Sequence, residues 1–265
     1  MGWEFGILLF GMFAEILLIF LMSRGRVYRA FPIFFLYLCW SLFSDSFLYY
    51  VRVALPYATF YHIYRIQLTV DSLMIFALLV EVAWSVLSPI RKSLPKYSWL
   101  GIALLVAVGG LILWPIAGFN APDYLDHVGT SYFRMQQTAA ILRAVFFLAL
   151  AGFSQVLSIG WRDRELQIAT GLGFFSISSL AVAILHIHQQ AGTPSYIWLD
   201  RVGSISYLAA LVYWDYAFAT RPAERREFSP QMQSMLLAVA GTARSTRIAL
   251  SDSDSDPDHP GKRRN

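Results

Sequence analysis

The sequence predicts an all-α polytopic membrane protein: a bundle of seven transmembrane helices with its N-terminus outside and its C-terminus inside the cell. Hydrophobic residues make up 57% of the 265 residues, and charged residues only 14%. The apolar residues fall into seven long stretches, and most charges lie between these stretches or in the C-terminal segment. A bilayer requires this segregation, because a charge is costly in hydrocarbon and is solvated in a connection.

Each apolar stretch is long enough to cross a hydrocarbon core of about 30 Å, which takes about 20 helical residues. Pro32 lies where the first turn of the second helix is expected, and Pro56 and Pro194 lie in connections. Arginines, not a small-residue cleavage site, follow the first stretch, so we expect a retained helix there. The longest predicted connection is 118–135. The predicted spans are 3–22, 31–53, 61–87, 99–117, 136–157, 168–188 and 197–220.

Lysine and arginine are unevenly divided between the two predicted sides. Eleven lie on the side reached after odd-numbered spans: Arg24, Arg26, Arg29, Arg91, Lys92, Lys96, Arg162, Arg164, Arg221, Arg225 and Arg226. Four lie on the opposite side: Arg52, Arg65, Arg134 and Arg201. Basic residues are retained on the cytoplasmic side, which gives the predicted orientation. The same bias accounts for the net charge of +4, so we expect the lipid bilayer and no nucleic acid as a partner.

Composition divides the chain into three parts. Residues 1–220 are expected to form the seven-helix transmembrane domain. Residues 221–250 form a basic, amphipathic cytoplasmic segment in which Met232, Met235 and Val239 recur at about helical spacing. Residues 251–265 have almost no apolar side chain to bury and are expected to be a disordered tail.

Three charged residues lie deep within predicted spans: Asp45, Asp71 and Arg143. A buried charge needs a partner, a water-filled cavity or a function. Helical spacing places Ser41 beside Asp45 and Gln67 beside Asp71, and it aligns Asp200, Ser204 and Tyr207 on the last span. The polar stripes can converge in the outer half of the bundle. Two carboxylates against one arginine leave a surplus acid, which a proton or a bound cation would balance. The predicted ligand-binding residues are Asp45, Asp71, Arg143, Ser41, Gln67 and Tyr207.

Other intramembrane acids are expected to have simpler roles. Glu15 should hydrogen-bond a neighbouring helix, whereas Glu81 and Asp215 lie near the inner boundary and should be solvated or paired with loop arginines. A purely structural network of Asp45, Asp71 and Arg143 remains an alternative to a ligand site. An aromatic cage above the acids would suit a cationic amine, and its candidates are Tyr49, Tyr61, Tyr64 and Tyr207.

Several classes of function lack the residues they need. A retinal pigment requires a lysine in the last helix, and the lysines here are Lys92, Lys96 and Lys262, all outside the spans. His186 and His188 are two apart, so on one helix their side chains diverge and make a poor metal site. There is no zinc-hydrolase, serine-hydrolase, paired-cysteine or phosphate-loop motif. We therefore expect no catalytic residues, no metal and no cofactor.

The sequence thus favours a sensory or receptor-like module of the cell membrane. It would bind a small polar or cationic ligand from the outer side and signal through a separate cytoplasmic partner, because no signalling domain follows the spans. An intramembrane lipid-modifying enzyme and an ion or small-molecule transporter, both using Asp45 and Asp71, remain alternatives. So does a structural membrane subunit whose charges only pack helices.

Overall fold

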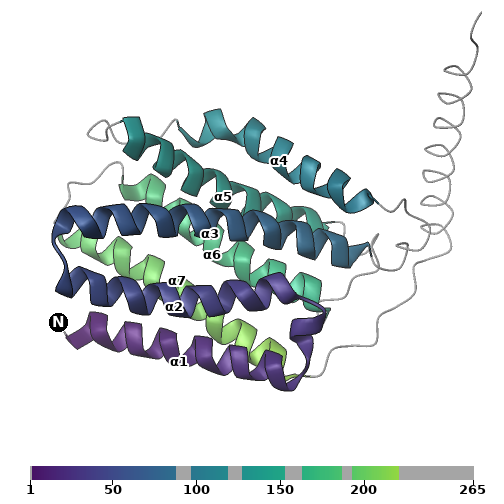
Figure 1. Ribbon diagram of the computed structural model, residues 1–265, viewed down its shortest axis with the longest axis horizontal. Helices are drawn as coiled ribbons and strands as arrows, with labels where there is room; N and C mark the ends of the chain where they lie inside the picture. Colours follow the sequence, from purple (N-terminus) through teal and green to yellow (C-terminus); the bar gives the residue numbers. More distant parts are fainter. Residues whose placement is uncertain (1, 88–96, 119–126, 153–162, 187–192, 221–265) are drawn as a thin grey trace, which may run out of the picture.

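The computed structural model describes residues 2–87, 97–118, 127–152, 163–186 and 193–220. These residues form seven α-helices and one short 3-10 helix. Successive helices run in opposite directions along the long axis of the molecule, and the N-terminus and the end of α7 lie at opposite ends (Figure 1). The elements are α1 Gly2–Arg24, η1 Val27–Arg29, α2 Pro32–Ala54, α3 Tyr57–Val86, α4 Ser98–Ala117, α5 His127–Gly152, α6 Arg164–His186 and α7 Pro194–Ala219.

The all-helical prediction is confirmed, with one error in the boundaries. α5 begins at His127, nine residues before the predicted start at residue 136, so much of the predicted connection 118–135 is helical. Residues 127–135 include His127, Thr130, Ser131 and Arg134, which lower the hydropathy without breaking a helix. Hydropathy therefore marked where this helix becomes apolar, and the helix itself starts two turns earlier.

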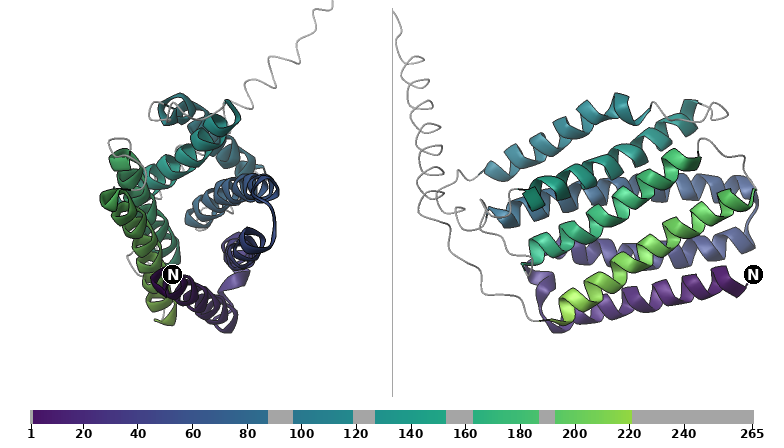
Figure 2. Two further views of the ribbon diagram at one scale, coloured as in Figure 1. Left: turned by 90° about the vertical axis from the view of Figure 1, so that its left-hand side faces the viewer. Right: turned by 180° about the vertical axis from the view of Figure 1, so that it is seen from behind.

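The helices form a closed ring in chain order. Each helix contacts the next, α7 returns to contact α1, and α3 also reaches α5 and α6. Figure 2 (left) shows the ring end-on, viewed along the long axis of the bundle from the end at which the N-terminus lies. One large apolar cluster joins α1, α2, α3, α5, α6 and α7, and a smaller one joins α3, α4 and α5.

Two glycines of α6 permit close packing with the helices on either side. A Cβ atom at Gly171 would overlap the indole of Trp214 in α7, and one at Gly173 would overlap the ring of Phe147 in α5. The indole Nε1 of Trp214 also donates a hydrogen bond to the Gln167 carbonyl at 3.2 Å. Aromatic rings thus lie directly against the α6 backbone, which fixes the rotation of α6 against both neighbours.

The outer surface of the ring is apolar. Leu105 is 72% exposed and Leu111 is 73% exposed, both on α4. Such a surface suits hydrocarbon as its solvent. Six helices, α1 to α6, are long and apolar enough to cross a membrane, which indicates a membrane protein. α7 has 26 residues but is not among the six.

Side chains from neighbouring helices cap two helix ends. Glu81 of α3 accepts hydrogen bonds from the backbone N–H groups of Ile33 at 2.7 Å and Phe34 at 2.9 Å, at the start of α2. The expectation that Glu81 is solvated or paired with loop arginines is therefore wrong. A carboxylate at this position satisfies two N–H groups that the helix cannot pair itself, and it complements the helix dipole.

The guanidinium of Arg164, at the start of α6, caps the last turn of α7. It donates to the carbonyl oxygens of Ala217 at 2.6 Å and Thr220 at 2.8 Å. Its Cζ also lies 4.6 Å from the ring centroid of Phe218. A cation at a helix C-terminus is favourable because the unpaired carbonyls carry partial negative charge.

Candidate functional site

A cavity of about 380 Å³ lies between α1, α2, α6 and α7. Glu15, Asp45 and Asp200 line it, so we call it the acidic cavity. All four helices contribute from the half nearer the end at which the N-terminus lies. Its apolar walls include Ile7, Leu8, Met12, Phe175, Val182 and Leu208.

Glu15 lies deepest in the acidic cavity, about 20 Å along α1 from Gly2, and is only 2% exposed. Its Oε1 accepts hydrogen bonds from Ser41 Oγ of α2 at 2.8 Å and from the hydroxyl of Tyr207 of α7. The two hydroxyl oxygens lie 3.2 Å apart. One carboxylate oxygen thus joins three helices, as expected for Glu15 from the sequence.

The other oxygen of Glu15 has no such partner. Within the part of the chain that the structure describes, Oε2 accepts no hydrogen bond, and Glu15 borders the acidic cavity. The half-buried carboxylate of Asp45 likewise has no hydrogen bond or ion pair to any described residue. These two groups expose unsatisfied negative charge or acceptor capacity to the cavity, and such groups are costly inside a bilayer.

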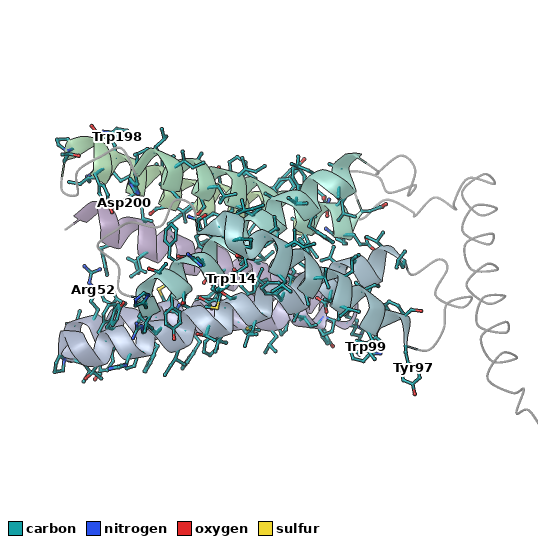
Figure 3. The ribbon with its side chains drawn as sticks, turned by 90° about the horizontal axis from the view of Figure 1, so that it is seen from above. Arg52, Tyr97, Trp99, Trp114, Trp198 and Asp200 are labelled. Atoms are coloured by element: carbon teal, nitrogen blue, oxygen red, sulfur yellow. The ribbon has the colours of Figure 1, made fainter. Side chains whose placement is uncertain are left out.

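Asp200 lies near the end of the bundle, about 9 Å along α7 from Pro194, and its side chain is 62% exposed. One of its oxygens lies 3.6 Å from Nε2 of His186, whose ring stacks on Tyr196. In Figure 3, Asp200 lies with Trp198 and Arg52 near one end of the bundle, whereas Tyr97 and Trp99 lie near the other and Trp114 lies between. Asp200 therefore marks the mouth of the cavity and Glu15 its floor.

The structure brings three of the six predicted ligand-binding residues together. Asp45 lines the acidic cavity, Tyr207 lines it and bonds to Glu15, and Ser41 bonds to the same oxygen of Glu15. These positions agree with the predicted face of α2 and with the predicted alignment of Asp200, Ser204 and Tyr207 on α7. Whether the six residues bind a ligand remains a prediction.

The other three lie elsewhere. Asp71 accepts a hydrogen bond from Trp40 Nε1 at 2.6 Å, and Gln67 donates to Ser44 Oγ at 3.2 Å, so both join α3 to α2. Arg143 is 6% exposed, and its guanidinium lies 5.5 Å from the ring centroid of Phe175. Among described residues it forms no ion pair with Asp45 or Asp71, although its charge interacts with that of Asp71 at longer range.

Sequence reasoning missed the central position of Glu15, although a signal was present. Glu15 is the only charged residue between Glu4 and Arg24, and a lone acid in the middle of a span is a candidate functional residue. The predicted aromatic cage is also incomplete, because Tyr49 and Tyr64 are exposed and do not line the acidic cavity. Of its four tyrosines, Tyr207 alone is among the residues lining the acidic cavity.

A second cavity of about 440 Å³ lies between α3, α4 and α5. The described residues of its lining include no charged side chain and one hydroxyl group, that of Thr138, which is buried without a hydrogen-bond partner among them. This space offers little chemistry beyond apolar contact. The described residues also include no group of three histidine, cysteine or acidic side chains placed to hold a metal, whereas His188 lies outside them.

Comparison of the chain with protein-family models, with curated proteins and with solved structures finds no match. The functional argument therefore rests on the acidic cavity itself.

Proposed function

We propose that this chain is a seven-helix membrane protein of the receptor type. It binds a small ligand from the outer side in the acidic cavity and passes a helix movement to a separate cytoplasmic partner. The observation that carries the proposal is that two acceptor groups, Glu15 Oε2 and the Asp45 carboxylate, border a cavity between four helices and have no partner among the described residues. Polar groups are retained inside a membrane mainly where function uses them.

The arrangement of α7 supports a seventh crossing. α7 packs against both α1 and α6, and the N-terminus and the end of α7 lie at opposite ends of the bundle (Figure 1). An odd number of crossings, together with the excess of basic residues on the side where α1 ends, favours an outer N-terminus. The mouth of the acidic cavity would then face outward.

The hydrogen bonds of Glu15 provide a route from ligand to helix movement. A ligand that engages Glu15 changes the balance of the bonds from Ser41 and Tyr207, which tie α1 to α2 and α7. The far end of α7 is tied to α6 by Arg164. A shift of α7 at the cavity would therefore reach the predicted inner surface, where a partner can detect it.

The inner side of the acidic cavity favours a receptor over a transporter. Beyond Glu15 and Leu208, the side chains of α1 and α7 that face the interior belong to one buried apolar cluster. They include Leu18, Met22, Leu211 and Trp214. An open channel would need a path that continues to the opposite side, and a transporter would need a second conformation in which that side opens. The hydrogen bond from Trp40 to Asp71 favours a packing role for that aspartate, so the structural alternative accounts for part of the polar network.

A cavity-filling variant tests the binding function. Gly203 lines the acidic cavity, and a side chain built there meets no atom within 4 Å, so Gly203→Phe should fill the cavity without a clash at its Cβ. Gly101→Phe is the matched control, because Gly101 has the same free space and lines neither cavity. We expect a library of small polar and charged molecules to include compounds that raise the melting temperature of the wild type and of Gly101→Phe, but not of Gly203→Phe.

A second measurement tests the receptor mechanism. Spin labels at Arg24→Cys and Thr220→Cys, in a Cys39→Ser background, report the distance between the predicted inner ends of α1 and α7. A compound that binds in the cavity should change this distance. An unchanged distance, or accumulation of the compound inside proteoliposomes, would contradict receptor function. Complete absence of compounds sensitive to Gly203→Phe would contradict ligand binding itself.

A further inference from the structure

We infer that the ligand of the acidic cavity is a small organic cation, an ammonium group attached to an apolar body. This inference rests on the proposed binding function and adds the chemical class of the ligand. It follows from three properties of the cavity: the sign of its charges, the absence of a cationic side chain among the described residues that line it, and the apolar character of its walls.

The charge of the cavity has one sign along its length. Asp200 lies at the mouth, Asp45 on the α2 wall and Glu15 at the floor. None of the described residues that line the cavity is a lysine, arginine or histidine. His186 pairs with Asp200 but does not line the cavity. An entering anion would meet like charge at each of these positions, whereas a cation would be attracted throughout.

The floor supplies the matching hydrogen-bond chemistry. Glu15 Oε2 and Asp45 have acceptor capacity with no partner among the described residues. A protonated amine carries donors and no acceptor, and hydrogen bonds between an ammonium and a carboxylate are stronger than neutral ones. The Oε1 atom of Glu15 is already occupied by the hydroxyls of Ser41 and Tyr207, which hold the carboxylate in position.

The size and walls of the cavity indicate an organic cation and not a metal ion. A volume of about 380 Å³ is within the range of small-molecule pockets, of order 300–1,000 Å³. Ile7, Leu8, Met12, Phe175 and Val182 offer apolar surface and no ligand for a hard cation. Calcium requires about six to eight oxygen ligands, and the described residues contain no cluster suited to a metal.

Matched sets of compounds test the sign of the ligand charge. The full-length protein in lipid nanodiscs is titrated with alkylamines and arylalkylamines of increasing size, each paired with the alcohol and the carboxylate of the same carbon skeleton. 2-Phenylethylamine, 2-phenylethanol and phenylacetate form one such set. Binding is measured by calorimetry and by the shift in melting temperature. We expect the best amine to bind at least about tenfold more tightly than its alcohol, and the carboxylate not to bind.

Three variants locate the charge. Asp45→Asn removes a charge at nearly constant shape and should weaken amine binding about tenfold or more. Glu15→Gln should do the same, and Asp45→Asn serves alone if Glu15→Gln fails to fold. Asp215→Asn is the control, because Asp215 lies about 10 Å along α7 beyond Leu208 and does not line the cavity. Its amine affinity should stay within about twofold of the wild type.

The outcomes separate this inference from the function on which it rests. Suppose that neutral or anionic compounds sensitive to Gly203→Phe bind as tightly as amines, or that amine affinity is unchanged in Asp45→Asn. The cavity then binds a ligand of another class, and the inference is overturned while the proposed function stands. If neither the amines nor any library compound is sensitive to Gly203→Phe, both are overturned.

Discussion

Side chains of three helices meet at one atom, Oε1 of Glu15. Ser41 and Tyr207 both donate to Oε1, so a change at any of the three side chains affects contacts of α1, α2 and α7 together. Interhelical hydrogen bonds in membranes contribute less than their isolation from water suggests, with a mean near 0.6 kcal/mol and values up to about 1.7 kcal/mol. A bond to a carboxylate is expected in the upper part of that range.

Tyr207→Phe should therefore lower the free energy of unfolding by about 1–2 kcal/mol, because it removes one donor to Glu15 and keeps the ring. Tyr216→Phe is the control, since Tyr216 lies on the same helix, is exposed and makes no contact with Glu15. Unfolding by denaturing detergent measures both. A loss in Tyr207→Phe no larger than that in Tyr216→Phe would show that the hydrogen bond does not stabilise the bundle.

Residue spacing predicted this cluster only in part. The helical period correctly placed Ser41 with Asp45 on one face of α2, and Tyr207 with Asp200 on one face of α7, because both relations are internal to a helix. It could not show which neighbour each face meets. Asp71 was expected to meet Arg143, but it accepts its hydrogen bond from the indole of Trp40.

At the scale of helices, the contacts of α6 with α5 and α7 determine which side of α6 faces the acidic cavity. The backbone at Gly171 and Gly173 lies against Trp214 and Phe147, so ring shape fixes the rotation of α6 relative to α7 and α5. Phe175 then lines the acidic cavity and lies against Arg143. This dependence on ring packing explains why sequence periodicity alone did not place Arg143.

Gly171→Ala should destabilise the protein by about 1–3 kcal/mol, because the added methyl group must displace the indole of Trp214. Gly101→Ala adds the same group to α4, where it meets nothing within 4 Å, and should be neutral or stabilising by up to about 1 kcal/mol through helix propensity. Thermal unfolding in one detergent compares the two. Equal melting temperatures would contradict the close packing of α6 on α7.

Hydropathy predicted most helix boundaries well. The start of every helix except α5 lies within four residues of the predicted start. The exception arises because residues 127–135 form helix without an apolar composition, and hydropathy responds to composition. α7 shows the opposite effect: it packs as a full member of the ring although its acids and Arg201 reduce its apolar character.

For the molecule as a whole, the direction of the bundle in the membrane is the property on which the proposed function depends. Ligand access from outside requires that the mouth of the acidic cavity and the connection between α2 and α3 share the outer side. Basic residues favour this orientation, with Arg24, Arg26 and Arg29 at the opposite end.

Single cysteines test the orientation. In a Cys39→Ser background, Leu55→Cys reports the connection between α2 and α3, and Gly25→Cys reports the end of α1. A membrane-impermeant maleimide added to intact cells should label Leu55→Cys and leave Gly25→Cys unlabelled until the membrane is opened. The reverse pattern would place the cavity mouth in the cytoplasm. Labelling of both cysteines from outside would contradict a crossing of the membrane by α2, which lies between them.

The cap that Glu81 forms on α2 also bears on how the protein is made. A ribosome completes α2 before α3. The N–H groups of Ile33 and Phe34 are therefore unpaired until Glu81 is synthesised, nearly fifty residues later. Trp40 and Ser44 of α2 likewise lack their hydrogen-bond partners until Asp71 and Gln67 of α3 have been synthesised. When α2 reaches the insertion machinery alone, its polar groups therefore lack their partners on α3. We expect the two helices to leave the translocon for the lipid as one hairpin, with their polar groups already matched.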